Sequence, residues 1–340
     1  MTAIPEGAIW VRLPRFVGDG LMMGQVLEPL RAEGRVLVAW GPEPVADLHR
    51  GSTWFDHAVG DASGKPGILE MARLLSRHRP LALLNFPRSE RALLAATLAF
   101  VPLRLGWTDG GARWVASRHA LFHAPGHQAD RYDELLRLGF PGLPRLEPRP
   151  FRPRPEAMEE AARLLAGAGV ERPPLVLSLG AAAPIKRLAT EVLLEFIPLV
   201  QAAGHPLILM GGDSTFDRGQ AEELKARHPE LLDFCGRCSW PVSGGLLALS
   251  CGVLANDSGL AHLAAASGLP LLTVFGPTRL ERTAPRGPHA RSLRMEELDC
   301  LGCLEFVCAR GDHACMRELR AERMWELLAS EMAAASAAGP

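Results

Sequence analysis

The stretch Asn256-Asp257-Ser258-Gly259-Leu260-Ala261-His262 decides how the second half of the chain is interpreted. An apolar run, Leu246–Ala255, comes before it, and the small apolar segment Leu263–Leu269 and a second apolar run, Pro270–Phe275, come after it. Short apolar runs bounded by turn residues are typical of buried strands, and the small-residue segment between them suits a helix. The order therefore predicts strand, tight turn, helix and strand.

The turn itself has the chemistry of an anion site. Asp257, Ser258 and Gly259 would stand where a helix starts, and the first backbone N–H groups of a helix lack intrahelical partners and favour negative charge. His262 follows about one turn later and can point to the same side. The stretch therefore predicts a bound phosphate. A helix cap at Asp257 and a satisfied, buried His262 are the structural alternative.

The composition indicates a globular protein of about two domains. Of its 340 residues, 48% are hydrophobic and 22% are charged, and the formal net charge is −1, so no overall basic field would attract nucleic acid. No apolar stretch reaches the ~18 residues that span a bilayer, and no export signal is visible at the start of the chain. We therefore expect a cytoplasmic protein without a nucleic-acid partner, with peripheral membrane contact left open.

Strand-like and helix-like segments alternate in the first half, which argues for a parallel sheet covered by helices. The expected strands are Ile9–Leu13, Arg35–Trp40 and Leu81–Phe86, and the expected helices are Leu21–Glu33, Ile68–His78 and Ser89–Ala99, with Arg15–Gly20 as a loop. The proline-rich segment Phe140–Pro155 can be neither a regular helix nor a central strand. We therefore expect it to link two domains.

The same alternation starts again after this segment. The expected elements are helix Glu156–Ala166, strand Leu175–Leu179, loop Gly180–Arg187, helix Leu188–Ala203, strand Pro206–Met210, loop Gly211–Asp217, a helix to Arg227 and a final helix Arg317–Ala337. The predicted fold is α/β, with two Rossmann-like, doubly wound domains, residues 1–150 and 151–340, facing across a cleft. Ligands of such domains bind at the carboxyl ends of the strands.

Gly18-Asp19-Gly20 follows the first expected strand and falls at the start of the next helix. Asp is among the best N-cap residues, so a structural cap is one interpretation of Asp19. The other is a general base at the mouth of the cleft.

Two loops of the second half carry further candidates. Lys186-Arg187 puts two cations at an expected helix start, where positive charge opposes the helix dipole, so we expect an anion that offsets them. A solvated pair is the alternative. Gly211-Gly212-Asp213 would let a ribose or base approach the backbone, with Asp213 or Asp217 accepting hydroxyl hydrogen bonds, although an ordinary strand-to-helix turn explains the glycines as well.

Four of the seven cysteines, Cys300, Cys303, Cys308 and Cys315, lie close together along the chain. Four thiolates can close a tetrahedral zinc site, whereas two disulfides or four reduced, buried thiols are the alternatives. In each case we expect a structural role and not a catalytic one. Cys235 and Cys238 form a separate pair to which we assign no function.

Taken together, these motifs resemble glycosyltransferase family 9, the ADP-heptose:lipopolysaccharide heptosyltransferases. The resemblance covers nearly the whole chain in order, and its most specific part is Asn256–His262. The other residues that carry it are Val17–Gly24, Asn85–Pro87 with the helix after it, Leu105–Trp107, Lys186-Arg187, Gly211-Gly212, Phe275–Thr278 and Cys315-Met316.

The resemblance implies a GT-B fold with an N-terminal acceptor domain and a C-terminal nucleotide-sugar domain. It implies an inverting, metal-independent transfer of heptose from ADP-heptose to a lipopolysaccharide core acceptor, with no cofactor required for catalysis. The implied partners are ADP-heptose, or a similar nucleotide sugar, and a lipid-linked saccharide.

The family's residue roles carry over to matching positions of this chain. Asp19 would be the base that deprotonates the acceptor hydroxyl, and Lys186 would neutralise charge on the diphosphate. On the donor side, Ser258, Gly259 and His262 would contact phosphate, Asp257 would hold the loop or a sugar hydroxyl, and Gly211, Gly212 and Asp217 would line the ribose. Arg88 and Arg91 would meet acceptor phosphates.

The loop Ala181-Ala182-Ala183-Pro184 departs from the family pattern, because many relatives have threonine or serine there. The Trp-Pro that often follows the lysine is also missing. Two alternatives therefore stand beside the main interpretation: a GT-B enzyme that uses another nucleotide sugar, such as a UDP sugar, and a nucleotide-sugar-binding protein with a degenerate site.

Overall fold

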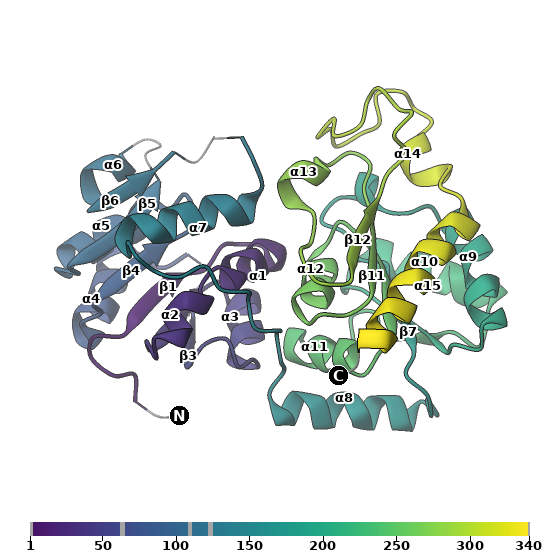
Figure 1. The fold of residues 1–340 in the computed structure, drawn as a ribbon, viewed down its shortest axis with the longest axis horizontal. Helices are drawn as coiled ribbons and strands as arrows, with labels where there is room; N and C mark the ends of the chain where they lie inside the picture. Colours follow the sequence, from purple (N-terminus) through teal and green to yellow (C-terminus); the bar gives the residue numbers. More distant parts are fainter. Residues whose placement is uncertain (1–2, 62–64, 108–110, 122–124, 339–340) are drawn as a thin grey trace. The chain divides into compact units, whose positions relative to one another are not determined.

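The computed structural model describes residues 3–61, 65–107, 111–121 and 125–338. It divides into two compact units, Met1–Arg149 and Pro150–Pro340 (Figure 1). The division falls within the proline-rich segment. Of the helices in the described part of the chain, none combines the length and apolar composition that crossing a membrane requires.

Unit 1 is a six-stranded parallel sheet in the order β3-β2-β1-β4-β5-β6, with helices between the strands. Its elements are β1 (Ile9–Arg12), α1 (Val17–Gln25), α2 (Glu28–Ala32), β2 (Leu37–Gly41), α3 (Glu43–Arg50), β3 (His57–Gly60), α4 (Ile68–His78), β4 (Ala82–Asn85), α5 (Glu90–Leu98), β5 (Leu103–Trp107), α6 (Ala112–Val115), β6 (Arg118–Ala120) and α7 (Gln128–Gly139).

Unit 2 repeats this plan, with a parallel sheet in the order β12-β11-β10-β7-β8-β9. Its elements are α8 (Pro155–Gly167), β7 (Leu175–Ser178), the 3₁₀ turn η1 (Pro184–Lys186), α9 (Thr190–Ala202), β8 (Leu207–Met210), α10 (Thr215–Arg227), β9 (Leu232–Asp233), α11 (Trp240–Ala248), β10 (Gly252–Asn256), α12 (Gly259–Ala266), β11 (Leu271–Val274), α13 (Leu280–Thr283), β12 (Ala290–Leu293), α14 (Ala314–Arg317) and α15 (Ala321–Ala338).

Both sheets therefore have the Rossmann strand order, which confirms the predicted α/β class. The order reverses between β1 and β4 in unit 1 and between β7 and β10 in unit 2. In such sheets ligands bind beyond the carboxyl ends of the strands at this switch point. The switch points therefore locate the candidate site in each unit.

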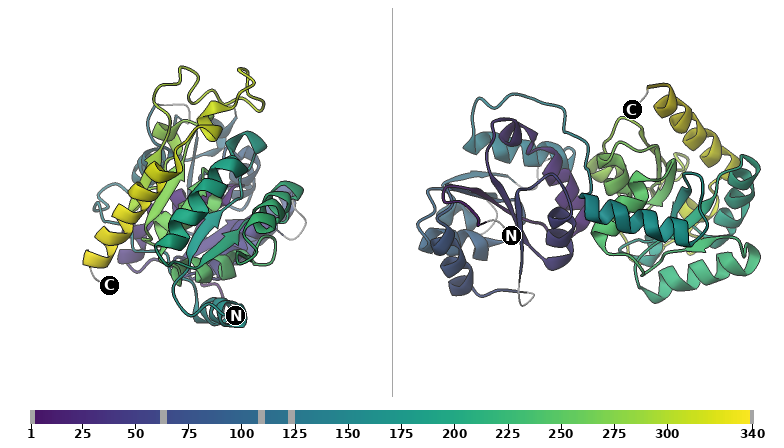
Figure 2. Two further views of the ribbon diagram at one scale, coloured as in Figure 1. Left: turned by 90° about the vertical axis from the view of Figure 1, so that its right-hand side faces the viewer. Right: turned by 90° about the horizontal axis from the view of Figure 1, so that it is seen from below.

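The central strands form because they can be buried on both faces. Every residue of β7 and β10 is buried, as expected for strands of a parallel sheet with helices on both sides. In unit 2, α15 packs against β10, β11, β12 and α9 and closes one face of the sheet (Figure 2). Phe196 and Met324 are completely buried in that core, where each contributes about 1.5–3 kcal/mol by leaving water.

One expected element of unit 2 is corrected by the structure. The apolar run Leu246–Ala255 is not one strand, because its first part belongs to α11 and only its end belongs to β10. A fully buried helix and a buried strand show the same apolar run, and the signal that separates them here is the Ser239 cap at the start of α11. The helix start expected at Asp257–Gly259 is confirmed, because α12 begins at Gly259 with Ser258 as its N-cap and His262 lies in its first turn.

In unit 1 the prediction of a loop at Arg15–Gly20 is wrong. Helix α1 begins at Val17 and contains Gly18, Asp19 and Gly20. Gly20 is needed there, since a Cβ atom at this position would lie 2.8 Å from Cγ1 of Val45 on α3. The helix expected over Leu21–Glu33 is divided into α1 and α2, and Pro29, which has no N–H to donate, lies in the first turn of α2.

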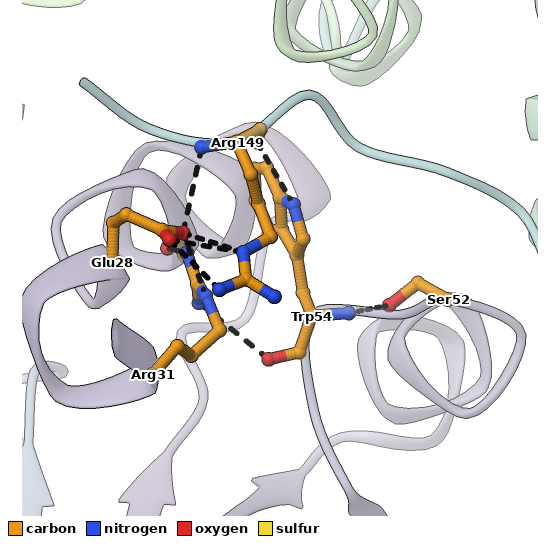
Figure 3. Close-up of polar contacts among 6 residues, drawn as sticks. Glu28, Arg31, Ser52, Trp54 and Arg149 are labelled. Atoms are coloured by element: carbon orange, nitrogen blue, oxygen red, sulfur yellow. Dashed lines mark hydrogen bonds and ion pairs between the residues drawn. The ribbon is translucent and has the colours of Figure 1, made fainter. Parts of the chain in front are cut away.

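The connection between the units is fixed to each unit on either side of Pro150. Arg149 Nε lies 3.0 and 2.9 Å from the two carboxylate oxygens of Glu28, and Trp54 Nε1 donates to the Arg149 carbonyl at 3.2 Å (Figure 3). Burial alone would raise the pKa of Glu28, but hydrogen bonds from Arg149 and the charge of Arg31 hold that pKa below its ordinary value. On the other side, Phe151 is buried and its N–H donates to the Ala266 carbonyl at 2.7 Å.

Candidate functional site

The candidate site of unit 2 lies where β7 and β10 end side by side. Ala255 pairs with Ser178 in the parallel ladder, so the loops after both strands emerge at the same edge of the sheet. The Asn256 side chain joins these loops: its Oδ1 accepts from the Leu188 N–H at 2.8 Å, and its Nδ2 donates to the Leu179 carbonyl at 3.0 Å. Asn256 is buried, and these bonds satisfy the amide that burial would otherwise leave unpaired.

Lys186 and Asp257 meet at this edge. Lys186 Nζ lies 2.9 Å from Asp257 Oδ2, although the two residues are 71 positions apart in sequence. The Asp257 side chain is 9% exposed and that of Lys186 is 23% exposed. A carboxylate this buried requires a partner, and the ammonium group keeps further N–H donors for a second anion.

The first turn of α12 adds backbone donors beside this pair. Ser258 is the N-cap, and its Oγ accepts from the Ala261 N–H at 3.4 Å. The N–H groups of Gly259 and Leu260 lie ahead of the intrahelical ladder, and Ser258 and Gly259 are partly exposed. His262 is buried in the same turn. A cation and a helix N-terminus thus lie at one edge, which is an arrangement that binds phosphate.

Arg187, next to Lys186, has a structural role. Its guanidinium donates to the Leu179 and Ala181 carbonyls at 3.3 Å each, forms an ion pair with Asp217, and lies 5.5 Å from the Phe216 ring centroid. The anions expected to offset the two cations are therefore supplied by the protein, as Asp257 for Lys186 and Asp217 for Arg187. The alternative that Lys186 and Arg187 are two solvated surface cations is therefore wrong.

Asp217 lies in the first turn of α10 and is 3% exposed. Its Oδ2 accepts from the Gly212 N–H at 2.6 Å, and a Cβ atom added to Gly211 would lie 3.1 Å from the same oxygen. Gly211 and Gly212 are therefore glycines partly because the backbone must approach this buried carboxylate. Asp213 is largely exposed and pairs with Arg218.

In unit 1, Asp19 is partly exposed and lies in the first turn of α1, directly after β1. The N-cap position is Phe16, which corrects the interpretation of Asp19 as the cap residue. A carboxylate in this turn is stabilised by the helix dipole. Arg88 is exposed after the neighbouring strand β4, and Arg91 Nη2 donates to the Pro66 carbonyl at 2.6 Å.

A further charged residue of unit 1, which was not among the predicted site residues, ends strand β1. Arg12, the last residue of β1, donates from Nη1 and Nη2 to the two oxygens of Asp61 at 2.8 Å each and lies 4.5 Å from the Trp40 ring centroid. The sequence signal that could have identified Arg12 is a charged residue within the apolar strand Ile9–Leu13.

All seven cysteines are free, so the alternative of two disulfides is wrong. Among the residues that the structure describes, no group of three or more His, Cys, Asp or Glu side chains could hold a metal ion, so the alternative of a zinc site at Cys300, Cys303, Cys308 and Cys315 has no support in the geometry. Burial, together with the other three thiols, raises the pKa of Cys315 to about 11, which favours the protonated thiol.

Comparisons with known proteins agree with this architecture. The structure of the E. coli ADP-heptose lipopolysaccharide heptosyltransferase II superposes with a TM-score of 0.80 at 21% identity, over 97% of this chain and 99% of that one. This likeness establishes a GT-B fold built from two Rossmann-like units. The profile of glycosyltransferase family 9 (heptosyltransferase) matches residues 83–313, and the chain belongs to this family.

Two curated relatives are similar over shorter stretches. Lipooligosaccharide heptosyltransferase 2 of Haemophilus influenzae is 30% identical over 169 residues, which cover 47% of this chain and 48% of the relative. The protein of the same name from Campylobacter jejuni (serotype O:2) is 27% identical over 120 residues, or 33% of this chain and 38% of the relative. The match thus spans less than half the length of either relative.

Proposed function

We propose that the chain is an inverting, metal-independent glycosyltransferase that moves heptose from ADP-heptose to a lipopolysaccharide core acceptor. The observation that carries the proposal is the Lys186–Asp257 pair beside the N-terminus of α12, at the switch point of unit 2. The family assignment and the heptosyltransferase names of the relatives support the choice of sugar.

On the donor side, the bond from the anomeric carbon to the diphosphate breaks, and negative charge develops on the departing ADP. Lys186 and the N–H groups of Ser258 and Gly259 would meet that charge, with His262 as a further donor and Asp257 holding Lys186 in place. Fixed donors aimed at developing charge lower the barrier, and removing one typically costs about 2.7–4 kcal/mol. The same donors supply the positive charge that a metal ion would provide, which supports metal independence.

The nucleoside would lie beside the loop after β8. The glycines at 211 and 212 leave room for the ribose, and Asp217 is the proposed acceptor for its hydroxyl groups. The ion pair of Asp217 with Arg187 supports a second role for Asp217, which is to hold the loop that carries Lys186.

On the acceptor side, the hydroxyl oxygen attacks the anomeric carbon from the face opposite the diphosphate, which inverts that centre. The hydroxyl proton passes to the Asp19 carboxylate, and such general-base assistance contributes roughly 10²–10⁴-fold. Arg88 and Arg91 are the proposed contacts for acceptor phosphates, because guanidinium groups bind phosphate well.

A lipid-linked acceptor would bring the enzyme to the inner face of the inner membrane. Trp114 of unit 1 is 78% exposed, and the guanidinium carbon of Arg113 lies 4.8 Å from its ring centroid. An exposed tryptophan beside a cation is suited to a membrane–water interface, which supports peripheral contact.

Two measurements test the donor assignment. Calorimetric titration should show ADP binding more tightly than UDP, and Lys186→Met should weaken ADP binding, whereas the reverse preference would favour the alternative of another nucleotide sugar. Turnover with ADP-heptose and a lipid A–core acceptor should persist in excess EDTA, and loss of turnover would contradict the metal-independent mechanism. A chain that binds no nucleoside diphosphate at millimolar concentration would be a degenerate relative.

A further inference from the structure

The segment from Cys300 to Met316 has no part in the proposed chemistry, yet it is bonded to the loop that carries Lys186. His313 Nε2 lies 2.6 Å from the Ile185 carbonyl oxygen, so the ring N–H donates to the residue directly before Lys186. Three residues further along, the Met316 carbonyl accepts from the Ala189 N–H at 3.0 Å. These bonds join the segment to the Lys186 loop on both sides of the lysine.

The segment is itself anchored at a second place. The N–H of Gly302 donates to the Gly276 carbonyl at 2.9 Å, and the N–H of Leu304 donates to the Pro277 carbonyl at 2.7 Å. A Cβ atom at Gly276 would lie 2.7 Å from Cys315 Sγ and 2.9 Å from Met316 Sδ, so the loop after β11 packs tightly against it. Met316 is completely buried in the core of unit 2.

His313 has a backbone conformation that residues other than glycine rarely adopt, with φ 53° and ψ 33°. Such a conformation costs free energy and persists where the surrounding contacts hold it. Asp312 Oδ1 accepts from the Ala314 N–H at 3.2 Å, and Arg310 Nη2 donates to Asp312 at 2.8 Å. The chain around His313 is thus held in the conformation that directs its ring to Ile185.

We propose that His313 is a positioning residue for Lys186, and that the cysteine-rich segment serves as a brace that holds the Lys186 loop for the departing diphosphate. Asn256 supports this loop through Leu188, and His313 supports it through Ile185. The Lys186 ammonium is therefore kept in place by more than its ion pair with Asp257. The proposal rests on the proposed function of Lys186.

The kinetic test compares His313→Ala, Lys186→Met and the double variant. His313→Ala should lower kcat/KM about 3- to 10-fold, the effect of losing one partly buried hydrogen bond. In the Lys186→Met background, His313→Ala should lower kcat/KM less than 2-fold, because the ammonium group that His313 positions is no longer present. His313→Gln, which retains an N–H donor, should recover part of the loss. His228→Ala, at the far end of α10, is the control and should leave kcat/KM unchanged.

A second readout does not depend on turnover. Hydrogen exchange of the amides of residues 185–189 should be faster in His313→Ala than in the wild type, with the exchange of β7 and β10 unchanged, and the affinity for ADP should fall. The brace proposal would be overturned if His313→Ala lowered kcat/KM by the same factor with and without Lys186. It would also be overturned if hydrogen exchange at residues 185–189 were unchanged. If the wild type turned over no nucleotide sugar while exchange still responded, the proposed function would fail and the brace would stand.

Discussion

Replacing His49 should make unit 1 less sensitive to acid. His49 lies on α3, completely buried, with its ring 4.7 Å from Phe55 and 6.4 Å from Trp54 between centroids. Neither ring nitrogen has a hydrogen-bond partner among the residues that the structure describes. Burial, with a smaller contribution from the Arg31 charge, lowers the pKa of His49 to about 3. The ring of His49 in the folded protein is therefore neutral at pH values well above 3.

The dependence of folding stability on pH follows from that lowered pKa. In the unfolded chain a histidine binds its proton with a pKa near 6.5, so between pH 6.5 and pH 3 the unfolded state carries the extra proton and stability falls as the pH falls. From pH 8 to pH 5 the loss from this one group is about 2 kcal/mol. That value hardly changes for any folded-state pKa below 4, because at pH 5 such a ring is still neutral.

The assay is urea unfolding of the wild type and His49→Phe at pH 8 and pH 5, followed by tryptophan fluorescence. Five of the seven tryptophans lie before residue 150, so the signal reports mainly unit 1. The variant should lose about 2 kcal/mol less than the wild type between the two pH values. His119→Phe, at an exposed position, is the control, and His49→Leu guards against overpacking. Equal losses in the wild type and both His49 variants would refute the reasoning.

Three further predictions concern the site and its supports. Lys186→Met should lower kcat by about 10²–10³-fold, as for other lost transition-state donors, whereas the matched Lys225→Met, in the last turn of α10, should stay near the wild type in the same transfer assay. Glu28→Gln leaves Arg31 and Arg149 without their anion and should destabilise unit 1 by about 3 kcal/mol in urea unfolding, whereas exposed Glu33→Gln should change little. Gly276→Ala forces a Cβ atom against Cys315 and should lower the stability measured by thermal unfolding by about 1–3 kcal/mol. Gly219→Ala, in open space within α10, should raise it by about 0.5–1 kcal/mol. A destabilised Gly219→Ala variant would contradict this reasoning.

The fold could be predicted because local sequence patterns indicate alternating strands and helices. Buried strands such as β7 and β8 are short apolar runs with turn residues at both ends, and their order along the chain implies parallel pairing. The boundary errors had local causes. Ser239 starts α11 within a long apolar region, and α1 continues through two glycines that pattern reasoning assigns to a loop.

The chemistry of the candidate site was partly visible in the sequence and partly hidden in the fold. The helix start at Ser258 could be predicted from residue types alone, because its capping is local. The Lys186–Asp257 pair and the contact of His313 with Ile185 could not, since they join residues 71 and 128 positions apart. Arg187 and Asp217 each look like ligand-binding residues in sequence, and only their contact with one another shows how much of their charge is used within the protein.

The central claim is that a carboxylate of unit 1 removes the proton while unit 2 holds the departing diphosphate. The most direct measurement is the single-turnover rate of heptose transfer from ADP-heptose by Asp19→Asn, with ADP affinity measured on the same preparation. A rate lower by at least about 10²-fold with unchanged ADP affinity is the predicted result. A rate equal to that of the wild type would contradict the assignment of Asp19 as the base.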